Sequence, residues 1–172
     1  MRDFFFIMSY IHQSDKHIGG GIYLSASCLL NKRYRNKSLE VARVVNRSID
    51  QFRKYLNLPK DVKVRIAPIK GSTNGRYNNQ CKVVELDCTL SWNKALEVFA
   101  HELVHAEQYH EKRLIKKLEG RHGWIHSWNG TKTFNKGSTY RAYRNQPWEV
   151  EAWERQAQLA EQVCQDLEKL YA

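Results

Sequence analysis

The stretch NKALEVFAHELVHAEQYHEKRLIKKLE, residues 93–119, decides how this chain folds. Its apolar residues recur every three or four positions, which predicts one amphipathic helix with a single buried face. Ser91 or Asn93 is a suitable N-terminal cap. The helix carries the run His101-Glu102-Leu103-Val104-His105, so the two imidazoles lie on one face about one turn apart. Its apolar positions are Leu96, Phe99, Ala100, Leu103, Leu114 and Leu118.

Two histidines four residues apart on a helix are typical of a zinc site. Their imidazoles can bind one Zn²⁺, while a glutamate beside the first histidine faces the water that the metal activates. The spacing therefore predicts His101 and His105 as metal ligands and Glu102 as the general base. The alternative is a surface helix that carries two histidines by coincidence. Glu111 and Gln108 stand where metzincins have a third histidine and a glycine, which excludes that class.

A catalytic zinc uses three protein ligands, and two later segments offer the third. His122 and His126 follow Gly120, in a segment without helical periodicity. Glu149 and Glu151 open a helix predicted from 147 to about 170. They are two residues apart, so both cannot point at one metal from a regular helix. Acidic residues at a helix start also stabilise the helix itself, which is the alternative explanation for both.

The metal helix, a short hairpin and a helix beginning Pro147-Trp148-Glu149-Val150-Glu151-Ala152 resemble the glutamate zincins, which are small zinc metallopeptidases. The resemblance covers roughly residues 93–160. It implies Zn²⁺ held by His101, His105 and the glutamate directly before alanine, Glu151, with Glu149 as the alternative. It also implies a protein or peptide substrate. One departure is that position 155 holds Arg155, where the larger thermolysin-type enzymes have an aspartate that orients a histidine.

A second resemblance is to the SprT-like proteases, which act on proteins attached to DNA. Arg121-His122-Gly123-Trp124 is similar to their third-ligand segment, which makes His122 the second choice for the third ligand. Residues 124–134 alternate around Asn129-Gly130, however, which predicts a β-hairpin rather than a helix. A third possibility is a binding protein that keeps a zincin fold without activity. Glu102 argues against it, because a structural zinc site does not need a base.

Four side chains are candidates for stabilising the oxyanion that peptide hydrolysis produces. Tyr143 is preferred, and the others are Tyr140, His122 and His126. The tyrosines can equally serve in packing, and the histidines as exposed polar residues.

The expected fold is α+β, with residues 1–172 in one domain. A minimal zincin fold implies a small twisted, mostly antiparallel sheet with a backing helix, followed by the metal helix and the C-terminal ligand helix. Strands are predicted at 4–11, 22–29, 62–69 and 81–88, the backing helix from 36–38 to 56, and a loop at 71–79. The strand 81–88, or its neighbour, is expected to form the edge that pairs with an extended substrate.

The net charge of +10 is the main compositional signal. Basic residues cluster at 32–37 and at Lys112, Arg113, Lys116, Lys117 and Arg121, which could attract nucleic acid or an acidic protein, or simply form a solvated face. The apolar run 4–11 is too short to span a membrane and has no cleavage site behind it, so we expect a cytoplasmic protein without a membrane partner. Four scattered cysteines are expected to be reduced.

Overall fold

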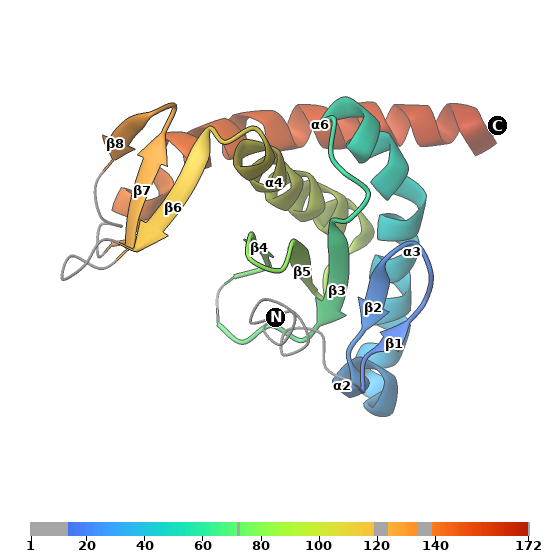
Figure 1. Ribbon diagram of the computed structural model, residues 1–172. Coiled ribbons are helices and arrows are strands. Elements are labelled where there is room, and N and C mark those ends of the chain that lie inside the picture. The colour runs from blue at the N-terminus through green and yellow to red at the C-terminus, as the bar shows by residue number, and fades with distance from the viewer. Residues whose placement is uncertain (1–13, 72, 119–123, 134–138, 172) are drawn as a thin grey trace.

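The computed structural model describes residues 14–71, 73–118, 124–133 and 139–171 (Figure 1). Helices and strands are intermixed along the chain, which confirms the α+β class. Their bounds are β1 Lys16–His17, β2 Ile22–Leu24, α2 Ala26–Leu30, α3 Lys32–Tyr55, β3 Lys63–Ala67, β4 Gly75–Asn78, β5 Val83–Asp87, α4 Trp92–His110, β6 Leu114–Leu118, β7 Trp124–Trp128, β8 Thr131–Thr133, α5 Tyr140–Arg144 and α6 Pro147–Tyr171.

The central sheet has the strand order β1-β2-β3-β5-β4. β2 pairs with β3 in parallel, and β3 pairs with β5 in parallel. The two outer strands, β1 and β4, pair antiparallel to their neighbours. The sheet is therefore mixed, and the expectation of a mostly antiparallel sheet was wrong. The reason is the long connection through α2 and α3, which returns the chain to start β3 in the same direction as β2.

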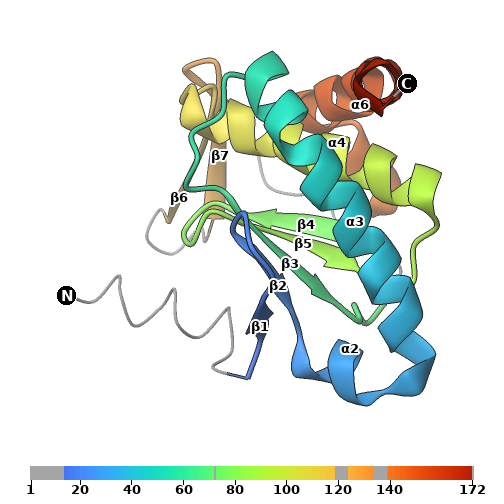
Figure 2. The same cartoon turned by 90° about the vertical axis from the view of Figure 1, so that its right-hand side faces the viewer.

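Two helices cover one face of this sheet. Figure 2 shows α3 and α4 side by side above the strands, with α6 on the far side of α4. Alternate sheet residues such as Val64, Ile66 and Leu86 are fully buried beneath them. The rings of Phe52 on α3 and Phe99 on α4 meet edge to face, with centroids 5.4 Å apart. This core fixes α4 over the sheet and so fixes the position of its histidines.

A second, three-stranded sheet has the order β6-β7-β8 and lies near the beginning of α6 (Figure 1). β7 and β8 form the hairpin that Asn129-Gly130 predicts. Both turn residues have positive φ, 48° and 80°, which is the backbone of the tight turns that suit a twisted hairpin. This prediction is confirmed.

The metal helix is shorter than its sequence pattern predicts. α4 ends at His110, and residues 114–118, expected to continue it, form β6. Lys112 has a φ of 60°, a left-handed conformation that a helix does not continue through. The spacing of Leu114 and Leu118 suits both structures. Positions four residues apart share one face of a helix, and positions an even number of residues apart share one face of a strand.

Other elements follow the sequence more closely. The strands 62–69 and 81–88 are confirmed as β3 and β5, and the last helix is confirmed as α6. The backing helix is confirmed as α3, although it begins earlier, at Lys32, after the side chain of Asn31 caps it. The predicted strand 22–29 is wrong beyond Leu24, because Ser25 caps the short helix α2. The predicted strand 4–11 lies outside the described residues.

The edge strand is β4, within residues predicted as a loop. β5 lies between β3 and β4, so the first choice for the edge, 81–88, was wrong and its neighbour forms the edge instead. The polar sequence Gly75-Arg76-Tyr77-Asn78 has the alternation of a strand but too few apolar residues to predict one.

Candidate metal centre

Helix α4 places His101 and His105 together as their spacing predicts. Their Nε2 atoms are 3.2 Å apart, and each residue is only 8% exposed. The helix positions them because its apolar stripe, including Phe99 and Leu103, is held against the sheet and α6. The face that carries the imidazoles therefore points toward the first turn of α6.

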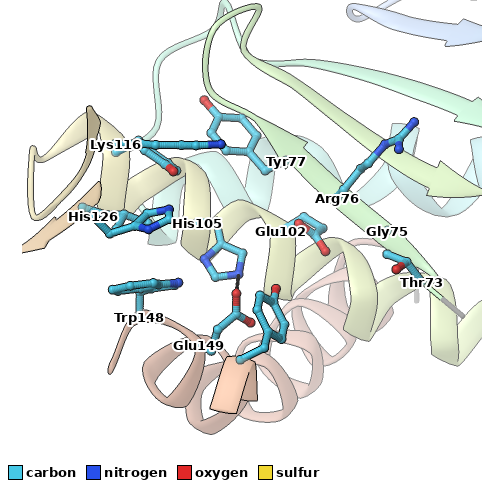
Figure 3. A pocket seen from close by; sticks show the side chains of 13 residues that line it. Thr73, Gly75, Arg76, Tyr77, Glu102, His105, Lys116, His126, Trp148 and Glu149 are labelled. Atoms are coloured by element: carbon cyan, nitrogen blue, oxygen red, sulfur yellow. Dashed lines mark ion pairs between the residues drawn. The ribbon is translucent and has the colours of Figure 1, made fainter. Parts of the chain in front are cut away.

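The third donor is Glu149, which is 3% exposed in the first turn of α6. One of its carboxylate oxygens lies 3.5 Å from His101 Nε2 and the other lies 3.5 Å from His105 Nε2. Figure 3 shows the carboxylate of Glu149 pointing at the ring of His105. His101, His105 and Glu149 form a buried group with the donor atoms of a metal site.

Glu151, the first choice for the third ligand, does not join this group. Its carboxylate accepts hydrogen bonds from Arg113 at 2.5 Å and from Arg155 at 2.7 Å. Two residues turn an α-helix by about 200°, so the helix face that presents Glu149 to α4 turns Glu151 away from the histidines. The residue that lies with the two histidines is Glu149, the stated alternative. His122, the second choice, lies outside the described residues.

The three donor groups lie close enough to share one metal ion. Two ligand atoms about 2.0–2.1 Å from zinc at a tetrahedral angle are about 3.3 Å apart. The two Nε2 atoms are 3.2 Å apart, and Glu149 lies 3.5 Å from each of them through a different carboxylate oxygen. Oε2 of Glu149 is buried without a hydrogen-bond partner. A cation between the three groups would satisfy this oxygen.

The other nitrogen of each histidine contacts a glutamine. His105 Nδ1 lies 2.9 Å from Gln108 Oε1, and His101 Nδ1 lies 3.0 Å from Gln156 Oε1. Gln108 is fully buried, and its amide nitrogen donates to the carbonyl oxygen of Trp148 at 2.9 Å. Its oxygen therefore accepts a hydrogen bond from the N–H of His105 Nδ1. In the neutral imidazole this arrangement leaves Nε2 with the lone pair that a metal requires.

Glu102 lies beside the histidines on α4 and is 7% exposed. Burial raises its pKa, while His105 and His101 act in the opposite direction. The edge strand passes directly over it at Gly75. A Cβ at that position would lie 2.6 Å from Cγ1 of Val98 and 3.2 Å from Cγ of Glu102, so only glycine lets β4 approach α4 so closely.

The buried ionisable groups around the centre differ in the direction in which their pKa values are shifted. Although burial opposes ionisation, His101 and His105 lower the pKa of Glu149 to about 2. Burial likewise opposes the charging of His105, but Glu149 and Glu102 raise the pKa of His105 to about 9. Glu149 is therefore ionised, which suits a metal ligand. Glu102 is the carboxyl group whose burial favours the protonated form.

Tyr143 of α5 is the preferred oxyanion candidate, and the structure brings it to the centre. Burial, followed by the charge of Glu149, raises its pKa, so its hydroxyl keeps its proton. Tyr140, on the same short helix, is 69% exposed. His126 is buried on β7, and its ring centroid is 4.8 Å from that of Trp148. Both side chains line hollows that adjoin the centre.

An ion-pair network behind the centre joins α4, α6 and the connection to β6. Glu107 of α4 pairs with Arg155 of α6 and with Arg113, which precedes β6. Glu151 pairs with both arginines. Arg155 thus joins the two helices through Glu107 and Glu151 rather than orienting a histidine. The network holds α6, and with it Glu149, against the metal helix.

A cleft runs along β4 and passes over the donor group (Figure 3). Its central hollow has a volume of about 390 Å³ and is lined by Glu102, His105 and Glu149. A second hollow of about 300 Å³, the Trp153 hollow, lies on the His101 side and shares Gly75 and Tyr143 with the first. A third of about 390 Å³, the Gln80 hollow, follows the far end of β4. The candidate centre is therefore open to a ligand that follows the edge strand.

Comparisons with known proteins identified no relative: no family model matches this chain, and neither the curated proteins nor the solved structures contain a match. Across the described residues, every helix is too short or too polar to cross a membrane.

Proposed function

We propose that this protein is a zinc-dependent metallopeptidase of the glutamate zincin type. The observation that carries the proposal is the convergence of His101, His105 and Glu149 beside a buried Glu102, at the floor of an open cleft. A third donor that comes from α6 and carries a carboxylate supports this type over one with three histidines.

Two histidines and one carboxylate are a donor set that suits Zn²⁺. A zinc ion held by them would polarise a peptide carbonyl and lower the pKa of a water toward 7. Gln108 and Gln156 orient the two imidazoles, so that both Nε2 atoms face the same point.

Glu102 serves as the general base and then as the general acid. It removes a proton from the attacking water and delivers it to the leaving amine. Its raised pKa suits this double role, because a carboxyl group with an ordinary pKa is a weak proton acceptor near neutral pH. Tyr143, whose hydroxyl keeps its proton, donates a hydrogen bond to the oxyanion.

The edge strand supplies a binding surface for an extended peptide. Asp87 N–H donates to Asn74 C=O, which places the paired backbone groups at Asn74 and, by alternation, at Arg76 and Asn78. The N–H and C=O groups of Gly75 and Tyr77 therefore point away from β5, toward the cleft, where the N–H of Tyr77 donates to the carboxylate of Glu102. A substrate chain that pairs with Gly75 and with the C=O of Tyr77 crosses the donor group in extended form.

The first test is metal content followed by hydrolysis. The purified protein should hold one equivalent of zinc and cleave an unfolded protein such as casein. Glu102→Gln should keep its zinc and lose hydrolysis by at least about a hundredfold, because it removes only the proton acceptor. Full activity in Glu102→Gln would disprove the mechanism, and zinc binding without any hydrolysis in the wild type would favour a binding protein.

A matched pair of variants tests the ligand assignment. Glu149→Ala should lose the zinc, while Glu151→Ala, two residues away on the same helix, should retain it. The opposite result would restore Glu151 as the third ligand.

A further inference from the structure

A broad groove lies outside the cleft, between α2, the start of α3 and the residues that follow β3. It has a volume of about 810 Å³, and its lining includes Leu30, Lys32, Tyr34, Pro68, Ile69 and Lys70. Among the described residues, none lines both this groove and one of the three hollows of the cleft. Figure 1 and Figure 2 both show α2 at the end of the molecule opposite β6 and β7. We call this surface the Leu30 groove.

The Leu30 groove exposes apolar side chains to water. Leu30, the last residue of α2, is 85% exposed, more than any other large hydrophobic residue in the described part of the chain. The next residue, Asn31, caps α3 by accepting a hydrogen bond from the N–H of Arg33 at 2.9 Å, so Leu30 stands at a fixed junction between two helices. Pro68 and Ile69 add partly buried apolar surface on the other side. Exposed apolar surface around a groove is typical of a protein-binding site.

The rim of the groove is basic. Lys32 of α3 and Lys70, which follows β3, are both exposed and line it. The segments that carry them are free of acidic residues, since neither 16–39 nor 62–84 contains Asp or Glu. The groove therefore presents positive charge beside its apolar walls.

One carboxylate does approach the groove, from the neighbouring strand β5. Asp87 accepts hydrogen bonds from the backbone N–H groups of Ile69 and Thr89, both at 2.8 Å. It is only 9% exposed, so its charge is directed at these backbone groups and not at the solvent side of the groove.

The basic residues at the start of α3 do not stabilise that helix. Its first turn contains Lys32 and Arg33 and no acidic residue. Positive charges near a helix N-terminus are unfavourable, because the helix dipole is positive there. Binding of an anionic partner accounts for their position, since such a partner is attracted by both the side chains and the helix end.

We propose that the Leu30 groove binds an acidic amphipathic segment of another protein. The apolar side chains of this segment pack on Leu30 and Ile69, while its carboxylates face Lys32 and Lys70. The walls favour a peptide over a nucleic acid, because a single strand needs exposed aromatic rings on which its bases stack. Tyr34 is partly buried and packs against the core, and the exposed apolar wall is aliphatic.

The groove is near the cleft along the chain. Lys70 lies three residues before Thr73, which lines the Trp153 hollow. Three residues span at most about 11 Å, so a protein docked in the groove is held beside the cleft. Docking itself uses none of the metal-binding residues and does not depend on the proposed peptidase activity.

Binding of a fluorescent model peptide tests the proposal. The probe is an amphipathic peptide of about 16 residues, with leucines on one helical face and glutamates on the other. The protein is Glu102→Gln, so that the probe is not cleaved. We expect this peptide to bind, and versions with Gln for Glu or with Ser for Leu to bind at least about tenfold more weakly. Added salt should weaken the binding.

Variants of the groove assign the binding to its residues. Leu30→Ser should weaken binding of the probe about tenfold, and Lys70→Glu should weaken it about three- to tenfold. Leu170→Ser is the control for the first, because Leu170 is also exposed but lies near the end of α6.

Lys60→Glu is the control for the charge reversal. Lys60 precedes β3 and Lys70 follows it, so a strand of about 13 Å separates them. This distance exceeds the Debye length of about 8 Å at physiological salt. Both control variants should bind the probe within about twofold of the Glu102→Gln protein.

Three results would overturn the proposal. The first is undetectable binding at about 100 μM peptide. The second is binding that the groove variants leave unchanged or that the controls weaken equally. The third is a single-stranded oligonucleotide that binds more tightly than the peptide and is weakened by Lys70→Glu, because the surface would then be a nucleic-acid site. Zinc content and casein cleavage are measured separately, so the failure of either proposal does not decide the other.

Discussion

Gln108 holds His105 in one tautomer. The amide oxygen of this fully buried glutamine lies 2.9 Å from His105 Nδ1, and its nitrogen donates to the backbone of Trp148. Trp148 directly precedes Glu149. The side chain of Gln108 therefore orients one of the two histidines and also hydrogen-bonds to the start of the helix that carries Glu149. A glutamine does this without adding a negative charge beside the histidine.

Gln108→Leu should therefore weaken zinc binding about 10- to 100-fold, because it frees the imidazole and leaves the Trp148 carbonyl without its donor. Competition with a chelator of known affinity measures the change. Gln158→Leu is the control, since Gln158 is exposed on α6 and should bind zinc like the wild type. Unchanged zinc affinity in Gln108→Leu would show that the histidine needs no such partner.

The sequence predicted most of the centre from local spacing. His101, Glu102 and His105 needed only the four-residue period of one helix. The third donor depends on how α6 packs, and the signal for it was present but not used. Glu149 is in phase with the buried positions Ala152, Ala160, Val163 and Leu167, whereas Glu151 falls outside this stripe. Glu151 also precedes Arg155 by four residues, which is the spacing of a helical ion pair.

Long-range pairing accounts for what could not be predicted. β4 is four polar residues whose strand conformation comes from pairing with β5, and nothing within 75–78 reveals that partner. The same applies to β6, since Leu114–Leu118 satisfies both a helical and a strand period until β7 is in place. Gln108 reaches His105 from three residues away on the same helix, but its contact with Trp148 and the contact of Gln156 with His101 span 40 and 55 residues, so no local pattern indicated these two.

The Glu151 ion pairs predict a pH dependence of stability. Burial opposes the ionisation of Glu151, but Arg113 and Arg155 lower its pKa below the usual value of 4.5. A lowered carboxyl pKa contributes stability that is complete above pH 4.5 and is lost as the pH falls further. In metal-free protein, Glu151→Gln should cost about 1 kcal/mol of unfolding free energy at pH 7 and progressively less below pH 4.5.

Urea denaturation of both proteins at pH 7 and at pH 3.5 gives this difference. Glu161→Gln is the control, because Glu161 is exposed on the same helix and should change stability little at either pH. A Glu151→Gln deficit that is equal at the two pH values would exclude the ion pairs as its cause.

Gly75 sets the distance between the edge strand and the general base. Gly75→Ala places a methyl group against Val98 and Glu102, which should destabilise the protein by about 1–3 kcal/mol and reduce hydrolysis. Thermal unfolding and peptide cleavage measure the two effects. Asn74→Ala, at the neighbouring exposed position, should affect both much less. Wild-type stability and rate in Gly75→Ala would mean that β4 can move away from α4 at little cost.

Tyr143 tests the proposed oxyanion contact, because a phenylalanine keeps the ring and removes only the donor. Tyr143→Phe should lower kcat about 100-fold while leaving zinc content unchanged, since a hydrogen bond made mainly in the transition state affects the chemical step. Tyr140→Phe removes an exposed hydroxyl from the same helix and should change kcat by less than about twofold. If Tyr143→Phe raises KM and leaves kcat at the wild-type value, the hydroxyl binds substrate and another group stabilises the oxyanion. His126, which lines the same hollow, is then the next residue to replace.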